Sequence, residues 1–147
     1  MIIMDIKIVC KNKKALFDYE VLETVEAGLI LQGTEVKSIR QGLASLDGSY
    51  AILEKNKLLL VNCTIQEYKN ATTNHNPQRD RILLLKKSEI KKFAEKAKHK
   101  GFTLVPISMF IKKGMVKIDL AICKGRQLHD KREFIKSREI SKEMKEQ

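Results

Sequence analysis

The sequence has no tryptophan, and it has only three tyrosines and five phenylalanines among 147 residues. Proteins that bind single-stranded nucleic acid without sequence preference stack successive bases on aromatic side chains. This chain has few side chains for such a stacking platform. If it binds nucleic acid, we expect recognition of shape and of the phosphate backbone.

Cysteine is also scarce. Cys10, Cys63 and Cys123 are widely spaced and form neither a CxxC pair nor a cluster with histidine. Such a pattern indicates neither a disulfide framework nor a zinc site. We interpret the three as reduced thiols in or near the core, and we expect no metal and no cofactor.

No run of the sequence approaches the 18 or so apolar residues that a membrane-spanning helix needs. The N-terminus, MIIMDIKIVCK, has Asp5 where a secretory signal would have a basic region before an unbroken apolar core. We therefore expect a cytoplasmic protein with no membrane partner, and a monomer.

Positive charge is what the sequence has in excess. Its 29 lysines and arginines outnumber 18 aspartates and glutamates, which gives a formal net charge of +11. This imbalance favours a polyanionic partner, with nucleic acid first and an acidic membrane surface second. The length and the 43% hydrophobic content suit one compact domain with tails.

Catalytic patterns are absent from the sequence. His75, His99 and His129 are far apart in the sequence. None of them lies beside a plausible Ser or Cys nucleophile together with an orienting acid. No glycine-rich phosphate loop occurs either. We expect a binding protein and not an enzyme.

Alternating apolar and polar residues predict that strands dominate the chain. The predicted strands are 17–24 and 29–31 around a turn at Glu26-Ala27-Gly28, a hairpin of 49–53 and 58–65, and a hairpin of 102–111 and 115–123, while 67–80 reads as a long exposed loop. In the last hairpin Pro106 implies an edge or a bulge.

Two helices are predicted between these strands. One follows Gly33, with Thr34 as N-cap and Gly42 as its stop, and the other spans 87–100, with Ser88 as cap. The second helix has a lysine-rich outer face, which is either a phosphate-binding ridge or, more commonly, an ordinary solvated surface. The pattern predicts a mainly β fold, a small antiparallel barrel of the oligonucleotide-binding (OB) type with two or three peripheral helices.

The stretch 124–139, KGRQLHDKREFIKSRE, contains few apolar residues for docking a helix onto a domain. Burying two or three apolar side chains supplies roughly 1.5–3 kcal/mol each, against about 1–2 kcal/mol of backbone entropy per ordered residue. We expect an N-terminal extension at 1–11, a barrel at 12–123, and a basic tail at 124–147 that is disordered when free and helical on an anionic partner. The alternative is a solvated basic terminus without function.

Several blocks resemble one known family in order and spacing. They are Asn12-Lys13-Lys14-Ala15, GLILQGTEVKSIRQG from Gly28, SYAIL from Ser49, NHNPQRDRILLL from Asn74, GFTLVP from Gly101 and KGRQLHDKR from Lys124. Together they resemble the SmpB family, the SsrA-binding proteins, over about residues 12–140. The LQGTEVKS block and the KGxxxHDKR block are the specific part of the likeness.

The resemblance implies a barrel that binds the tRNA-like domain of transfer-messenger RNA and brings it to the A site of a stalled ribosome for trans-translation. It further implies a tail that folds along the empty mRNA channel, close to 16S rRNA at the decoding centre. Elongation factor Tu is expected in the delivery complex. Two alternatives stay open, a general single-stranded nucleic-acid-binding barrel and a ribosome-associated structural protein.

The resemblance also assigns residues. The expected RNA-binding set is Asn12, Lys13, Glu26, Lys37, Arg79, Leu84 and Lys117, and the expected decoding-centre set in the tail is Lys124, His129, Asp130, Lys131 and Arg132. Lysines and arginines suit phosphates, and Asn12 suits base edges or sugars. One departure is Ile82, where the family commonly has a lysine before its leucine run.

Overall fold

The computed structural model describes residues 6–126, 131–133 and 135–136. Its strands are β1 (Ile6–Lys11), β2 (Tyr19–Leu29), β3 (Ala44–Ser45), β4 (Tyr50–Glu54), β5 (Lys57–Val61), β6 (Thr64–Ile65), β7 (Arg81–Leu84), β8 (Phe102–Lys112) and β9 (Met115–Gly125). Its helices are α1 (Lys13–Asp18), α2 (Gly33–Arg40) and α3 (Lys87–Ala97). None of the described helices is long and apolar enough to cross a membrane.

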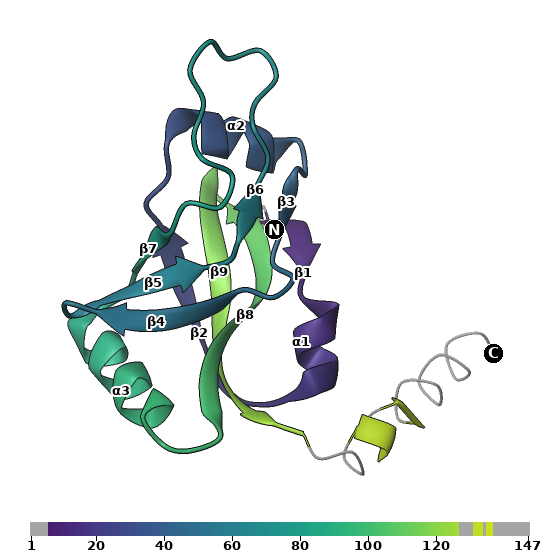
Figure 1. Cartoon of the computed structure of the whole chain (residues 1–147), viewed down its shortest axis with the longest axis vertical. Helices are drawn as coiled ribbons and strands as arrows, with labels where there is room; N and C mark the ends of the chain where they lie inside the picture. The colour runs from purple at the N-terminus through teal and green to yellow at the C-terminus, as the bar shows by residue number, and fades with distance from the viewer. Residues whose placement is uncertain (1–5, 127–130, 134, 137–147) are drawn as a thin grey trace, which may run out of the picture.

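The main sheet closes on itself. Its order is β1-β8-β4-β5-β7-β2-β9, and a further β8–β9 pairing joins the last strand back to β8. Every pairing in it is antiparallel. The three helices lie outside this ring (Figure 1). The predicted mainly β, OB-type barrel with peripheral helices is thus confirmed.

Strand β2 corrects one sequence prediction. The expected turn at Glu26-Ala27-Gly28 does not exist, because these residues continue β2 and pair in register with Asp119, Ile118 and Lys117 of β9. The prediction of a strand from residue 17 is also wrong at its start, since Phe17 belongs to α1. One long strand therefore replaces the predicted strand, turn and strand.

Strand β1 corrects the expected domain boundary. Residues 6–11 were expected to be an extension, but they pair with residues 108–112 of β8. β1 and β4 lie on the same edge of β8, on either side of a register shift between Pro106 and Ser108. Of the edge or bulge predicted at Pro106, the structure shows the bulge, and the barrel begins before residue 12.

The predicted hairpins, both predicted helices and the predicted stop of α2 at Gly42 are present, but the predicted N-caps are wrong. The β4–β5 hairpin turns through Lys55 and Asn56, both with positive φ. Helix α2 begins at Gly33 with the Gln32 N–H donating to Glu35 Oε1 at 2.8 Å, so Thr34 is not its N-cap. Helix α3 likewise begins after Lys86, whose N–H donates to Glu89 Oε1 at 2.9 Å, and Ser88 is not its cap.

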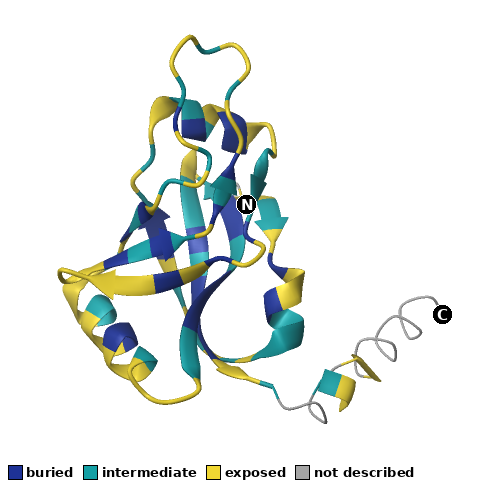
Figure 2. Ribbon diagram, in the orientation of Figure 1, coloured by how far each residue is buried: buried dark blue, intermediate teal, exposed yellow. Residues whose placement is uncertain are grey.

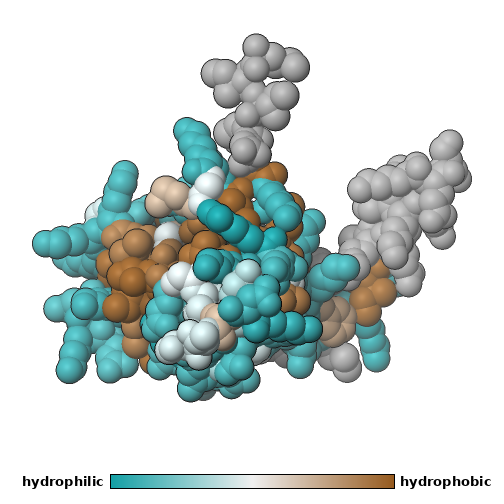
Figure 3. All heavy atoms as spheres, turned by 90° about the horizontal axis from the view of Figure 1, so that it is seen from above, coloured by the Kyte–Doolittle hydropathy of each residue, from teal (hydrophilic) through white to brown (hydrophobic). Residues whose placement is uncertain are grey.

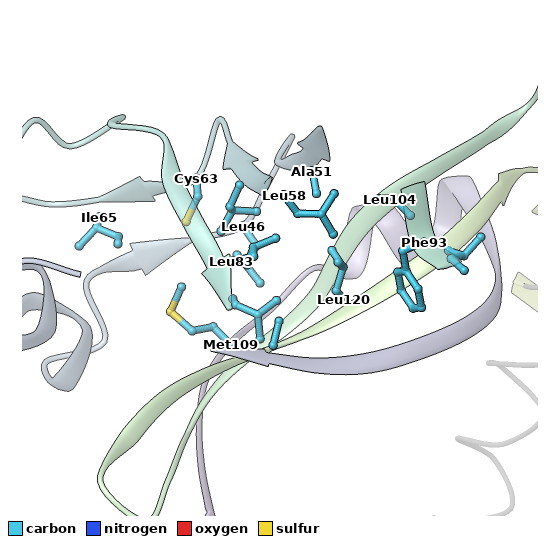
Figure 4. Packing of buried hydrophobic residues seen from close by; sticks show 14 of the residues in the cluster. Leu46, Ala51, Leu58, Cys63, Ile65, Leu83, Phe93, Leu104, Met109 and Leu120 are labelled. Carbon is cyan, nitrogen blue, oxygen red and sulfur yellow. The ribbon is translucent and has the colours of Figure 1, made fainter. Parts of the chain in front are cut away.

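The core lies inside the barrel, and α3 and α2 cover its ends. Leu58, Leu83, Leu104 and Phe93 are each at most 2% exposed, and Figure 4 shows them converging from separate strands and from α3. A second, smaller cluster joins Ala15 of α1 to Val105, Ala121 and Cys123. β9 is therefore buried on both faces from Leu120 to Cys123, although an alternating strand would bury only one face.

The cysteines are free thiols, as predicted. Burial raises the pKa of Cys63 to about 12 and the pKa values of Cys10 and Cys123 to about 11. Thiols with such pKa values remain protonated at neutral pH and react slowly as nucleophiles. Among the described residues, no group of three or more His, Cys, Asp or Glu side chains is arranged to hold a metal ion.

Candidate nucleic-acid interface

Three strands meet at Gly28, near the end of β2. On one side Gly28 pairs with Leu84 of β7, and on the other side it pairs with Lys117 of β9. A Cβ atom at residue 28 would lie 3.3 Å from the Leu84 Cβ and 3.8 Å from the Lys117 Nζ. Glycine therefore lets both side chains fold over the strand without crowding, and the backbone of Gly28 forms the floor between them.

A hollow of about 250 Å³ opens beside this point, which we call the Gly28 cleft. Its walls are mostly apolar, and they include Val36 of α2, Met115, Val116, Leu84 and Lys117. Leu84 and Met115 are 51% and 59% exposed. The end of the molecule that carries α2 shows hydrophobic atoms gathered among projecting hydrophilic side chains (Figure 3).

Exposed apolar groups beside a lysine suit an RNA whose base or ribose packs against the carbon surface while a phosphate meets the ammonium group. The prediction that Leu84 is available at the surface agrees with its exposure, so it is not a core residue. Leu84 and Lys117 are the two predicted site residues that the fold brings directly together.

Glu26 lies two residues before Gly28 on the same face of β2, since the intervening Ala27 is buried. Its carboxylate accepts a hydrogen bond from Lys112 Nζ at 3.1 Å and is exposed. This pairing lowers the repulsion that a bare carboxylate would exert on a nearby phosphate. Glu26 therefore borders the Gly28 cleft as an accessible acceptor.

Lys37 and Arg79 form a second group, on α2 and the 67–80 loop. The Lys37 ammonium lies 5.4 Å from the centre of the Tyr68 ring, a cation–π contact. Arg79 pairs with Glu35, and its side chain is 31% exposed. Both remain accessible to an anion, although Arg79 is also a structural residue.

The 67–80 loop is more ordered than its polar sequence predicted. His75 is 3% exposed and joins two elements, with Nδ1 2.8 Å from the Thr34 hydroxyl and Nε2 2.8 Å from the Ile65 carbonyl. Arg81, at 0% exposure, donates from Nε to Glu35 Oε2 at 2.7 Å. Neither Glu35 nor Arg81 was predicted as a site residue from the sequence. The available signal was a glutamate on the inner face of α2.

Asn12 and Lys13 lie at the start of α1, away from the cleft lining. Asn12 is 1% exposed: its amide donates to the carbonyls of Pro106 and Leu46 at 2.9 and 3.2 Å, and its Oδ1 accepts from the Ala15 N–H. These bonds cap α1 and fix it to the barrel, so the expected direct contact of Asn12 with RNA does not fit the structure. Lys13 is exposed.

The tail begins at the end of the β2–β9 ladder that lies opposite Gly28. Lys124 is exposed and pairs in register with Glu20 and with Phe102. Residues 131–133 and 135–136 have helical backbone, with Arg132 exposed. His129 and Asp130 lie outside the described residues.

Lys131 contacts α1. Its Nζ lies 3.3 Å from Asp18 Oδ1 and 5.4 Å from the centre of the Phe17 ring. Partly exposed contacts of this kind contribute about 0–1 kcal/mol each. The predicted disorder of the free tail and its folding on the ribosome stay predictions.

The lysine-rich face of α3 is only partly available to anions. Lys92 and Lys96 both pair with Glu23 of β2. These contacts hold the pKa of Glu23 below its usual value, through hydrogen bonds from Lys92 and then from Lys96. The two lysines in the middle of the face are thus engaged within the protein.

The closed antiparallel barrel, with its exposed cleft, defines a protein of the OB-fold class. A sequence model of the SmpB protein family matches residues 9–147. The chain belongs to the SmpB family.

Curated relatives are similar over nearly their whole length. The SsrA-binding protein of Treponema denticola is 46% identical over 140 residues, covering 95% of this chain and 91% of the relative. The SsrA-binding protein of Rickettsia bellii is 50% identical over 135 residues, covering 90% and 89%.

A solved structure is similar as well. It is described as "tmRNA-SmpB: a journey to the center of the bacterial ribosome", and it matches with a TM-score of 0.69 and 41% sequence identity. The match covers 81% of this chain and 85% of that chain.

Proposed function

We propose that this protein binds the tRNA-like domain of transfer-messenger RNA and carries it to the A site of stalled ribosomes, where trans-translation tags the unfinished protein. The observation that carries the proposal is the Gly28 cleft, where Lys117 and the exposed Leu84 fold over a glycine. The chain belongs to a family whose curated relatives are SsrA-binding proteins. The charge of +11 fits an RNA partner.

In this proposal the barrel binds RNA and catalyses no reaction. Leu84 and Lys117 contact the RNA directly, with Glu26 at the border as an acceptor for a base amino group or a 2′-hydroxyl. Lys13, Lys37 and Arg79 add phosphate contacts, and Asn12 positions Lys13 by capping α1. In the tail, Lys124, His129, Asp130, Lys131 and Arg132 act at the decoding centre and the empty mRNA channel, next to 16S rRNA.

The proposal includes the setting in which the protein works. The chain acts as a monomer in the cytoplasm, and elongation factor Tu joins it on the charged RNA. Similarity to a structure described as tmRNA-SmpB in the bacterial ribosome supports the RNA and ribosome partners.

A gel-shift assay tests the proposal against its alternatives. Labelled transfer-messenger RNA is mixed with the full chain and competed separately with bulk tRNA and with single-stranded DNA. We expect the complex to survive both competitors at a large excess. Equal competition by single-stranded DNA would indicate a general single-stranded binding barrel, and no shift at all would favour a structural role on the ribosome.

Lys117→Ala should weaken binding of transfer-messenger RNA and lower the slope of log K against log salt by about 0.9, the release of one counterion. The measurement is the dissociation constant at several salt concentrations. Lys100→Ala is a matched control, because Lys100 is exposed and lies just before β8, far along the ladder from Lys117. An unchanged slope in Lys117→Ala would remove Lys117 from the contact surface.

A further inference from the structure

A second depression lies between α3 and the β4–β5 hairpin. It consists of two hollows of about 520 and 410 Å³ that have Leu53, Ala94 and Lys98 in common, so they are two ends of one trough. We call it the α3 trough. It has no lining residue in common with the Gly28 cleft.

The trough lies where β4 separates from β8. β4 pairs with β8 only at Ala51 and Leu104, whereas it pairs with β5 along its whole length. Phe93 of helix α3, which is 2% exposed, packs in the same core cluster as Ala51 and Leu104. The next residue, Ala94, is too small to cover the outer surface.

Large apolar side chains are left exposed along this strand. Tyr50, Ile52 and Leu53 are 38%, 39% and 44% exposed. Figure 2 shows β4 as exposed along much of its length, beside the partly exposed α3. Successive side chains of a strand point to opposite faces, so Tyr50 and Ile52 share one face of β4 and Leu53 lies on the other. Leu53, with Ile90 and Ala94 of α3, gives the larger hollow an exposed apolar lining, and such linings in soluble proteins mark interaction sites.

The rim of the trough is basic. Lys87, Lys91 and Lys98 line it, against the single acid Glu95. None of these three lysines has an ion pair within the described residues, whereas Lys92 on the same helix is held by Glu23. Their charges are available to a partner.

We propose that the α3 trough docks an acidic amphipathic segment of a protein partner, one that presents aliphatic side chains flanked by Asp or Glu. The larger hollow places the aliphatic Leu53 and Ile90 beside a basic rim, which fits the apolar and the acidic sides of such a segment. The chain's own lysine-rich tail has the wrong charge. Helix α3 has 11 residues and is about 16 Å long, which matches a segment of about three helical turns.

The trough and the Gly28 cleft have separate linings, so a substitution in one leaves the lining residues of the other unchanged. The inference therefore does not depend on which RNA the barrel binds. It adds a protein-docking surface to a protein whose proposed partner in the cleft is RNA.

The test uses a fluorescein-labelled peptide of about 12 residues, the length of three helical turns, with leucines at helical spacing i, i+3, i+4 and i+7 and glutamates elsewhere. Its affinity for the full chain is measured by fluorescence anisotropy, beside a peptide in which lysines replace the glutamates. We expect Leu53→Gln to weaken binding of the acidic peptide about tenfold, because it removes apolar contact without adding charge. The double variant Lys91→Gln/Lys98→Gln should weaken it as much and lower its salt dependence.

Control variants and competitors make the result decisive. Leu84→Gln, in the Gly28 cleft, should leave peptide binding unchanged, and circular dichroism and transfer-messenger RNA binding report that the trough variants are folded. Equal binding of both peptides, or binding insensitive to Leu53→Gln, would overturn the proposal. So would displacement of the peptide by a short single-stranded RNA, or a dimer in sedimentation that Leu53→Gln dissociates, since these indicate RNA or a second copy as the occupant.

Discussion

A chain truncated after Gly125 should bind transfer-messenger RNA with nearly the affinity of the full chain, while tagging on stalled ribosomes falls to background. The truncation removes the proposed decoding-centre residues from His129 to Arg132 and leaves every residue of the Gly28 cleft in place. Tagging requires both the RNA-binding cleft and the tail, whereas RNA binding requires only the cleft.

The geometry of the β2–β9 ladder supports this separation. Lys117 pairs with Gly28 at one end of the ladder, and Gly125 pairs with Tyr19 at the other end. At about 3.4 Å per residue, the strand between Lys117 and Gly125 is roughly 27 Å long. Lys131 instead contacts Asp18 of α1, near the end where the tail begins.

The measurement is a pair of assays on the same protein preparations, a gel shift with transfer-messenger RNA and an in vitro tagging reaction on ribosomes stalled by a truncated message. The matched control is Leu84→Ala/Lys117→Ala in the full chain, which should lose RNA binding and tagging together. Parallel loss of both activities in the truncated chain would show that the tail belongs to the RNA-binding surface.

Glu35→Gln should lower the free energy of unfolding by about 3–5 kcal/mol, because it leaves a buried guanidinium without its counter-ion. The Glu35 and Arg81 side chains are both 0% exposed, and Arg81 Nε lies 2.7 Å from Glu35 Oε2. Glu35 also accepts from Arg79 and, at 2.8 Å, from the Gln32 N–H at the start of α2. One carboxylate thus joins α2, β7 and the 67–80 loop.

The same pair predicts a dependence of stability on pH. Burial alone would raise the pKa of Glu35, but hydrogen bonds from Arg79, the Gln32 N–H and Arg81 outweigh it and hold the pKa below its usual value. A carboxyl whose pKa is lower in the folded state stabilises the protein fully above the unfolded-state pKa, which is near 4.5. This stabilisation is lost as the pH falls below 4.5 and through the lower folded-state pKa.

Urea unfolding followed by circular dichroism, at neutral pH and at several acidic values below the unfolded-state pKa of 4.5, measures both effects. Glu23→Gln is the matched control, since Glu23 pairs with lysines at the surface and such pairs contribute little to stability. The loss of stability in acid should be smaller in Glu35→Gln than in the unchanged chain. A Glu35→Gln protein as stable as the Glu23→Gln protein would contradict the structural role given to this carboxylate.

The hairpins and α3 could be predicted from the sequence because their signals are local. Apolar residues alternate along 115–123 and recur at helical spacing from Ile90 to Ala97, and these patterns do not depend on distant residues. The turn at 26–28 was predicted wrongly because a glycine, considered without its tertiary neighbours, indicates a turn. Its actual role, to let Leu84 and Lys117 fold over the strand, depends on two strands that are distant in the sequence.

Sites that depend on tertiary contacts were the least predictable. Asn12 was interpreted as an RNA contact, yet its amide is bonded to Pro106, which lies 94 residues along the chain. The Glu35–Arg81 pair spans 46 residues and has no local pattern. Ala121 and Cys123 are buried on the outer face of β9 because α1 packs against them. This helix was not predicted, since Asn12 was not recognised as its N-cap.

The central claim is that transfer-messenger RNA binds the barrel at the Gly28 cleft and not through the tail. Methyl and amide NMR spectra of the full chain, recorded while an RNA fragment of the tRNA-like domain is added, test it most directly. The account predicts that the Leu84 and Met115 methyl signals and the Gly28 amide signal shift in proportion to bound RNA, while signals beyond Gly125 stay in place. Shifts confined to the residues after Gly125, with the Leu84 methyls unmoved, would contradict it.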